Sequence, residues 1–581
     1  MTTLPAVAHP SILPRSISVA LAIGRVEARK LLRHPTTLAG IVLSFAITIA
    51  MTWQYVPVLN RYDALTHEAL IPLAAAVLIA AHLATIRSRR HRTTELFDSL
   101  AASDATVTAG HLVSVLYVSC FALILVVAQL VYMRLIGGVT SPRPVVIFIG
   151  PALVAFTGAF GVALGRWVPR IFVGPLGIAG LVAFCTAMTT NTYAHEREWL
   201  SLWVQSEAFS GVASEVTIRP YGWRLLYFSG LVVVAAAAAF ARHPSKRVVA
   251  IGLSLAALLG TAYAGSREMH KTTRGEQMAI TTRLLEDYKD PLCREYASVS
   301  YCPSPGYEAW IERWRKPTEG VLAAAPAEAR PDDLRFLQAP GDLEAYDEDR
   351  NGHVSGWLRR ERKRGILSLE TDITPSLRWG RNGKEGESEL AIALLVAART
   401  IGVDTRFRLT QQDLHGIPRP RRHGFRARRL YDRCTTLEQG RSVVGLWLAA
   451  QATDGTEAAF SAAAARTPYV TDRTAGSNGY FEPLAWSLDE YLYATVGNPP
   501  IIWGARETNY ASQLLEQDAS EVRATIAENW DHLTDPATTS DQTAAILRLT
   551  PLPSLEEAID NWDYLGHYWG VEQLGGVPQC H

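Results

Sequence analysis

Apolar residues are concentrated in positions 1–265 of the 581-residue chain, and long apolar runs are nearly absent afterwards. A stretch of about 20 apolar residues spans the hydrocarbon core of a bilayer, and its backbone must be helical because lipid offers no hydrogen-bonding partner. The sequence therefore predicts a membrane protein whose α-helical transmembrane bundle covers residues 37–265, with about seven spans. These are Thr37–Trp53, Ala69–Ile86, Leu112–Met133, Val145–Val168, Ile171–Thr189, Leu225–Ala241 and Val248–Ala264.

Lysine and arginine residues predict the orientation of these spans, because cytoplasmic loops carry an excess of positive charge. One set of alternate loops holds Arg25, Arg29, Lys30 and Arg33, then Arg87, Arg89, Arg90 and Arg92, then Arg166 and Arg170, then Arg242, Lys246 and Arg247. The other set holds Arg61, Arg134 and Arg143, and Arg197, Arg219 and Arg224 spread over a longer loop. We expect a multi-pass plasma membrane protein with a cytoplasmic N-terminus and, after seven crossings, an extracytoplasmic C-terminal domain over residues 266–581.

The segment before the first span is amphipathic. In Ser18–His34, three apolar side chains lie near one stripe and three basic ones face elsewhere, as in a helix that lies in the membrane interface. We assign residues 1–36 to a cytoplasmic N-terminus with an interfacial helix and expect no cleavable signal peptide. The alternative is a cytoplasmic extension of the first span.

A polar segment, Arg87–His111, separates the second and third spans. Within it, Thr93–Ala102 has the pattern of a short amphipathic helix. Its apolar side holds Leu96, Phe97 and Leu100, and its polar side holds Glu95, Asp98 and Ser99. Such a helix predicts a docking site for a partner protein. The alternative is that it packs against the cytoplasmic ends of its own bundle.

The predicted outer loop Asn191–Trp223 mixes aromatic and charged residues, including Trp199 and Trp203. Tryptophan is enriched at membrane interfaces, so this loop forms either a re-entrant or interfacial helix or a solvated loop anchored by tryptophans. Within the predicted spans, His82 and Arg166 are the clear ionisable residues, and both lie near cytoplasmic ends. Because ion-coupled transporters bury carboxylates or histidines along their pathway, this distribution argues against an ion-coupled transporter.

Three segments carry a family resemblance over residues 15–245: Val26–Thr37, Arg89–Ser103 and Arg219–Leu231. Their order and setting resemble the permease of a type-2 ATP-binding-cassette (ABC) exporter. The resemblance implies an interfacial helix, then a coupling helix between the second and third spans, in which Glu95, Leu96, Phe97 and Leu100 enter a groove on an ABC ATPase subunit. It also implies a second permease copy, as a homodimer or heterodimer in the lipid bilayer, and export of a hydrophobic or amphipathic substrate.

Two features depart from that family. The last span, Val248–Ala264, adds a seventh crossing, and no G-x-x-x-x-G-K-[ST] motif is present to hold nucleotide phosphates. We therefore predict no enzymatic activity and no cofactor in this chain, with ATP hydrolysis in a separate subunit. The alternative function is a membrane-anchored sensor or receptor with a ligand-binding outer domain.

The C-terminal half is predicted to be a soluble mixed α/β or mainly α domain. Helical periodicity is clear in Glu387–Ile401, Gly440–Ala452 and Ala511–His532, and strand patterns occur in Ile366–Glu370 and Pro500–Trp503. The segment Lys316–Asp332, rich in Pro and Ala, indicates a linker or surface loop.

Four of the six cysteines fall in this half: Cys293, Cys302, Cys434 and Cys580. An even number suits disulfides in an extracytoplasmic space. We favour the pairs Cys293–Cys302 and Cys434–Cys580, although the sequence permits three pairings and also four unpaired thiols.

Motifs for other chemistry are incomplete. The segment Asp347–Ser355 has the opening of a calcium loop, but Leu358 occupies the position of the bidentate carboxylate, so we favour a hairpin at Asn351-Gly352 and predict no metal site. Neither H-E-x-x-H nor G-x-S-x-G occurs, which argues against a zinc peptidase or a serine hydrolase. The 56 basic and 56 acidic side chains balance, so no nucleic-acid partner is expected.

Overall fold

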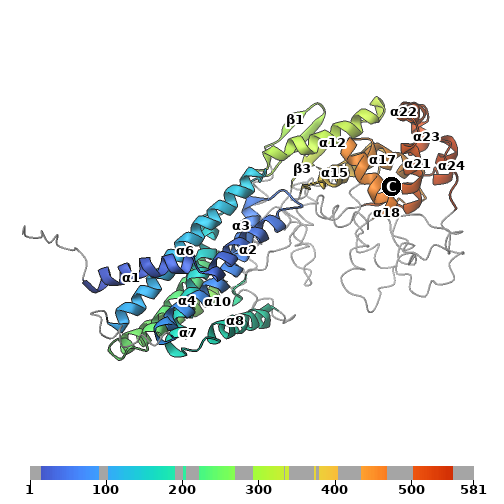
Figure 1. Cartoon of the computed structure of the whole chain (residues 1–581). Helices are drawn as coiled ribbons and strands as arrows, with labels where there is room; N and C mark the ends of the chain where they lie inside the picture. Colours follow the sequence, from blue (N-terminus) through green and yellow to red (C-terminus); the bar gives the residue numbers. More distant parts are fainter. Residues whose placement is uncertain are drawn as a thin grey trace, which may run out of the picture. The chain divides into compact units, whose positions relative to one another are not determined.

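The computed structural model describes residues 15–90, 103–189, 200–203, 221–268, 292–332, 334–338, 372–373, 379–403, 434–436, 438–466 and 501–553 (Figure 1). The chain divides into two compact units. The first comprises residues 1–53, 57–208 and 217–276, and the second comprises residues 54–56, 209–216 and 277–581. The two units are described separately below.

The first unit is helical in its described part, and each of the seven predicted apolar stretches lies on a helix. The amphipathic N-terminal segment also forms a helix, α1, which is joined to α2 at Pro35 with a bend of 62°. The helices are α1 (Arg15–Leu32), α2 (Pro35–Met51), α3 (Leu59–Ala69), α4 (Ile71–Arg90), α6 (Asp104–Leu135), α7 (Ile149–Trp167), α8 (Val173–Thr189), α9 (Tyr221–Phe240) and α10 (Arg247–Glu268), with 3-10 turns η1 (Val146–Phe148) and η3 (Pro244–Lys246).

Five helical stretches in the described residues are long and apolar enough to cross a membrane: Leu65–Arg87, Asp104–Leu135, Val146–Trp167, Tyr221–Phe240 and Pro244–Glu268. The bent pair α1 and α2 makes a sixth if it forms one span, and α8 contributes a shorter apolar helix, Val173–Met188. The structure thus agrees with a helical membrane protein joined to a soluble domain, while the count of seven spans stays a prediction.

Burial in α2 is inverted relative to a helix in water. Its buried residues are Thr37, Gly40, Ser44 and Thr48, whereas Val42 is 66% exposed. The hydroxyl groups of Ser44 and Thr48 donate to the carbonyl oxygens of Gly40 and Ser44, at 2.8 and 3.1 Å. Because these polar groups are satisfied within their own helix, α2 can present its apolar side to lipid.

The loops of the first unit meet at two ends of the bundle. At one end, the Leu59 N–H donates to the Val139 carbonyl oxygen at 2.9 Å, which joins the turns after α2 and after α6. At the same end a His67 ring nitrogen lies 3.0 Å from the Leu202 carbonyl oxygen. At the other end, Asp104 contacts Arg166 at the close of α7. The turn after α2, the turn after α6 and the loop that holds Leu202 belong to the loops with few basic residues. Arg166 belongs to the arginine-rich set.

The second unit is mainly helical in its described part, with two small sheets. The first sheet has the order β1-β2-β3-β4, with β1 and β2 antiparallel and the other neighbours parallel. Its strands are β1 (Arg294–Tyr296), β2 (Val299–Cys302), β3 (Arg335–Leu337) and β4 (Asp372–Ile373), and the second sheet pairs β5 (Cys434–Thr435) with β6 (Ile501–Ile502) in parallel. The helices are α12 (Ile311–Ala324), α15 (Glu385–Thr400), α17 (Gly440–Ala450), α18 (Asp454–Arg466), α21 (Ala505–Leu515), α22 (Ala519–Glu528), α23 (Trp530–Thr534) and α24 (Ser540–Ile546), with 3-10 turns η4 (Glu308–Trp310) and η5 (Ala327–Ala329).

The core of the second unit is built around α15 and α17. All eleven residues of α17 are buried, and twelve of the sixteen residues of α15 are buried. Aromatic side chains fill the space between α12 and the first sheet. Tyr301 and Phe336 stack with ring centroids 5.0 Å apart, and Trp314 stacks on Phe336 at 6.4 Å. Large aromatic surfaces of this kind supply much of the hydrophobic stabilisation of a small domain.

The structure confirms two predicted helices and corrects two other predictions. The predicted helices at Glu387–Ile401 and Gly440–Ala452 are α15 and α17. The linker predicted from Lys316 onward is wrong up to Ala324, because Trp314, Pro317 and Val321 lie on the buried side of α12, and this 3.6-residue period overrides the proline. The long helix predicted at Ala511–His532 is three helices. Asp518 interrupts it by accepting hydrogen bonds from the N–H groups of Ser520 and Glu521 at the start of α22.

The cysteine and strand predictions are met in part. Cys293 and Cys302 form a disulfide that closes the β1–β2 hairpin, with Cα atoms 4.1 Å apart. Cys434 begins β5, and Cys580 lies outside the described residues, so their pairing stays a prediction. The strand predicted at Pro500–Trp503 contains β6, whereas Ile366–Glu370 and the segment Asp347–Ser355 lie outside the described residues.

Candidate functional site

The structure describes both ends of the polar segment Arg87–His111 but not its centre, residues 91–102, which we call the coupling segment. Glu95, Leu96, Phe97, Leu100 and Arg92 lie outside the described residues. Arg89 and Arg90 belong to the end of α4, where only the backbone is described, and the side chain of Arg87 is described in full. In the outer loop, Trp199 lies outside the described residues and Trp203 is partly buried.

Helix α1 packs closely on α6, just after the coupling segment. A Cβ atom added at Gly24 would overlap the side chain of Val113, and one added at Gly110 would lie 2.5 Å from Ile23 Cγ2. Both glycines therefore allow a backbone approach that a larger residue would prevent. This contact fixes α1 against the segment of α6 that begins at Asp104.

Ion pairs join α1 to the end of α4, the helix before the coupling segment. Glu27 of α1 is only 9% exposed, and its carboxylate accepts hydrogen bonds from Lys30 Nζ at 2.7 Å and from Arg87 Nη1 at 3.1 Å. Arg87 lies in the last turn of α4. A carboxylate removed from water needs such partners, so these ion pairs hold α1 against the end of α4. Helix α1 thus contacts the helix before the coupling segment and the helix after it.

Asp104, the first residue of α6, connects the coupling segment to the rest of the bundle. The preceding residue, Ser103, caps the helix by accepting a hydrogen bond from the Thr106 N–H at 3.2 Å. The Asp104 carboxylate accepts a hydrogen bond from Arg166 Nη1 of α7 at 2.8 Å and lies 3.5 Å from Nδ1 of His243, between α9 and α10. One carboxylate therefore joins α6 to α7 and to the α9–α10 turn.

His243 makes a second contact with α6. Its Nε2 lies 2.9 Å from the Thr108 hydroxyl oxygen. Burial lowers the pKa of His243, the charges of Arg166 and Arg242 lower it further, and Asp104 opposes them. The net effect favours a neutral imidazole, so its link to α6 is a hydrogen bond more than an ion pair. The Asp104–Arg166 pair supplies the fixed opposite charges in this cluster.

Sequence reasoning identified Arg87 and noted Arg166, but did not find Glu27, Asp104 or His243. Glu27 lies on the amphipathic helix α1, Asp104 is the first residue of α6, and His243 lies in the turn between α9 and α10. The signal in the sequence was an acidic residue directly after a serine at the start of an apolar helix, as in Ser103-Asp104. That signal predicts a helix start, but it gives no information about partners from α7 and α9.

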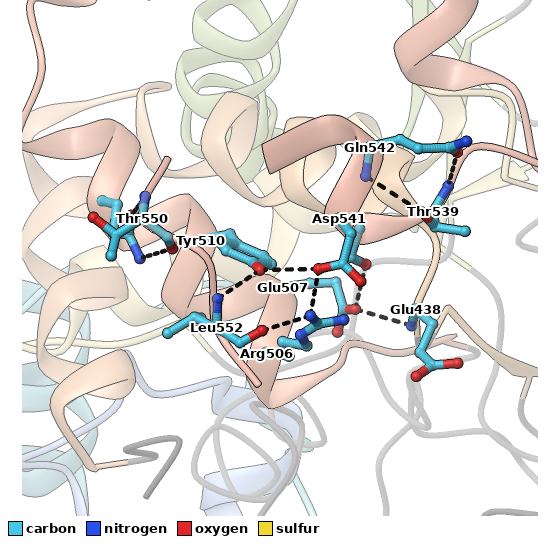
Figure 2. A network of polar contacts seen from close by, with 11 residues as sticks. Glu438, Arg506, Glu507, Tyr510, Thr539, Asp541, Gln542, Thr550 and Leu552 are labelled. Carbon is cyan, nitrogen blue, oxygen red and sulfur yellow. Dashed lines mark hydrogen bonds and ion pairs between the residues drawn. The ribbon is translucent and has the colours of Figure 1, made fainter. Parts of the chain in front are cut away.

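A second buried polar cluster lies in the second unit (Figure 2). Glu507 of α21 is fully buried, and its Oε1 accepts hydrogen bonds from the Ser540 hydroxyl at 2.6 Å and from the Glu438 N–H at 2.9 Å. Burial raises the pKa of Glu507, although both hydrogen bonds and Arg506 lower it. Beside it, Arg506 pairs with Asp541 and donates to the Leu552 carbonyl oxygen.

The contacts of this second cluster hold elements of the second unit together. Its contacts join α21 to α24 and to the turn before α17, as Figure 2 shows. Within the described ranges, no group of three or more His, Cys, Asp and Glu side chains is placed to hold a metal ion. The cluster around the coupling segment is the candidate functional site that the sequence predicted.

Comparisons of the chain with protein family models, with curated proteins and with solved structures found no match. The function is inferred below from the sequence and from the geometry around α1, α4 and α6.

Proposed function

We propose that this protein is the membrane-spanning permease subunit of an ABC exporter and binds a separate ATPase chain through residues 87–111. The observation that supports this best is the position of α1. It precedes the first predicted span at an angle of 62° and contacts both helices that flank the coupling segment. A partner that moves the segment would therefore move α1, α4 and α6 together.

The contacts of Asp104 extend this movement to the other helices. Because Asp104 pairs with Arg166 and His243, displacement of the start of α6 changes contacts with α7 and with the α9–α10 turn. Helix α6 has 32 residues, so it is about 48 Å long and reaches from this cluster to the opposite end of the bundle. A rigid helix of that length is suited to transmit a cytoplasmic movement across a bilayer.

In this proposal the energy comes from ATP hydrolysis in the partner. The sequence has no phosphate-binding loop of its own. The buried ion pair in the described helices, Arg224–Glu268 at 3.4 Å, lies at helix ends and not midway along a span. Its position therefore favours a structural role over a place on an ion pathway.

The same proposal places the second unit outside the cytoplasm. The disulfide between Cys293 and Cys302 supports this, because disulfides persist in oxidising compartments. The functional unit would contain two permease chains in the plasma membrane, identical or related, together with two ATPase subunits. The outer domain would act as a cap or substrate-handling module.

The first test is whether the neighbouring reading frame encodes an ABC ATPase, and the second is reconstitution of this chain with that ATPase. We expect the two to co-purify and the permease to stimulate ATP turnover, and we expect Glu95→Arg and Phe97→Ala to abolish that stimulation. Ser99→Ala, on the polar side of the predicted helix and opposite Phe97, is the matched control for Phe97→Ala and should leave stimulation unchanged. Unaltered assembly and turnover in both test variants would remove the coupling assignment. Association with a kinase or regulator in place of an ATPase would favour a sensor or receptor.

A further inference from the structure

The outward side of α1 carries a row of arginine side chains. Arg25 and Arg29 lie on α1, and Arg33 directly follows its last residue, where its N–H still donates to the Arg29 carbonyl oxygen at 3.2 Å. The three are spaced four residues apart, so they follow one ridge, and all three are exposed. Lys30 lies beside them, with half of its side chain exposed. We call Arg25, Arg29 and Arg33 the arginine ridge.

The arginine ridge has no acidic partner in the part of the chain that the structure describes. Glu27 is the sole acidic residue between positions 15 and 51, and it is buried against Arg87 and Lys30 on the inner side of α1. Arg25 Nε donates to the hydroxyl of Tyr117 at 3.3 Å, which is a neutral partner. Among the described residues, neither Arg29 nor Arg33 has an acidic partner. Like charges at this spacing repel one another, so the ridge is suited to an anionic ligand.

The position of the ridge indicates which anion is available. Helix α1 ends at Leu32, and Pro35 begins α2, whose apolar side chains Leu38 and Val42 are 50% and 66% exposed. If α2 enters the bilayer at Pro35, the ridge lies within one or two helical turns of the level where lipid phosphates begin. Val26, which is 51% exposed, adds an apolar side chain between the arginines, as interfacial helices commonly do.

We propose that the arginine ridge of α1 binds the phosphate groups of anionic phospholipids in the leaflet that α2 enters. The inference rests on the membrane placement in the proposed function but does not require an ATPase. Guanidinium groups suit this role because they are always charged and bind phosphate oxygens through two parallel hydrogen bonds. The buried Glu27 contacts keep α1 in place, so the ridge is presented on a fixed helix.

The test uses the purified full chain in micelles, without ATPase. Energy transfer from its tryptophans to dansyl-labelled phosphatidylglycerol or phosphatidylcholine reports binding of the anionic and the zwitterionic lipid. One basic side chain near an anionic surface contributes about a fivefold preference. We therefore expect a preference for phosphatidylglycerol that falls on the order of 100-fold in the triple variant Arg25→Gln/Arg29→Gln/Arg33→Gln, because three such contributions multiply. Inorganic phosphate should not displace the lipid.

The matched control removes the same charge from another arginine-rich turn. The triple variant Arg242→Gln/Lys246→Gln/Arg247→Gln alters exposed residues before and at the start of α10, and it should keep the preference within about twofold. If the first triple variant does not fold, Arg29→Gln alone should lower the preference about fivefold, since Arg29 has no partner among the described residues to lose.

Three results would overturn the inference. The first is equal binding of the two lipids by the unaltered chain, and the second is an equal loss of preference in both triple variants, which would indicate net charge and not the ridge. The third is an unchanged lipid preference in the ridge variant together with loss of ATPase association, which would make the ridge a protein-docking surface. Because lipid binding is measured without ATPase, a failure of the exporter proposal would leave the lipid result standing.

Discussion

The contact between Asp104 and Arg166 gives the sharpest test of how the coupling segment acts on the bundle. Asp104→Asn keeps the size of the side chain and removes its charge. Arg166 Nη1 lies 2.8 Å from the carboxylate, and the side chain of Arg166 is 12% exposed while that of Asp104 is 69% exposed. An ion pair with an exposed member contributes about 0.2–1 kcal/mol, and the low exposure of Arg166 places this pair at the upper end of that range, so we expect a coupling free energy of about 1 kcal/mol.

This free energy corresponds to about a fivefold change in an equilibrium between two arrangements of the helices. We expect Asp104→Asn to lower permease-stimulated ATP turnover about fivefold while the affinity for the ATPase is unchanged. The melting temperature of the purified chain should fall by about 2–4 °C. A double-mutant cycle with Arg166→Gln isolates the pair, because each single variant removes the same contact.

A matched control is available in the second unit. Glu312 is also 69% exposed, and its carboxylate lies 2.9 Å from Arg315, but both residues belong to α12. Glu312→Gln should change the melting temperature by less and should leave ATP turnover unaffected. A coupling free energy for Asp104 and Arg166 below about 0.3 kcal/mol, or an equal loss of turnover in Glu312→Gln, would refute the reasoning.

Three further predictions concern stability and packing. Burial raises the pKa of Glu507, so the folded state binds more protons than the unfolded state, and stability should fall as the pH rises above 4.5, the ordinary value for glutamate. In melting curves at several pH values, Glu507→Gln should lose this dependence, and its melting temperature should exceed that of the unaltered chain at about pH 8. A melting temperature that declines equally with pH in both proteins would contradict the assignment. Cys293→Ser should cost about 2–3 kcal/mol in denaturant unfolding of the second unit's signal, from loop entropy, and added reductant should then have no further effect on that hairpin. Gly110→Leu should separate α1 from α6 and lower the melting temperature by several degrees, whereas the same change at Gly252, where an added Cβ meets nothing within 4 Å, should be tolerated.

The helices of the first unit follow from the sequence because their cause is local. An apolar run of sufficient length forms a helix in lipid whatever its neighbours are, and the basic loops mark alternate ends of those helices. The amphipathic helix α1 was predictable for the same reason. In the second unit, α15 and α17 also follow from their apolar periodicity.

The same local reasoning failed where packing reversed a local preference. Pro317 predicts a break in the chain, yet α12 continues through it because Trp314 and Val321 are buried on the same side. Conversely, the apolar pattern of Ala511–His532 predicts one helix, yet α21 ends at Leu515 and Asp518 caps the start of α22. In both cases the free energy of burial or capping outweighed the intrinsic preference of the segment.

The sequence alone determined that the chain has a long apolar helical half, a second half able to form a disulfide, and a polar segment between two apolar helices. Only the tertiary structure showed that Glu27 meets Arg87 and that Asp104 meets Arg166, which is 62 residues away in the chain. Apolar length and periodicity act within one helix, whereas the partner of a charge depends on which helices pack together. The site around the coupling segment therefore depends on helix packing, which no local pattern in the sequence specifies.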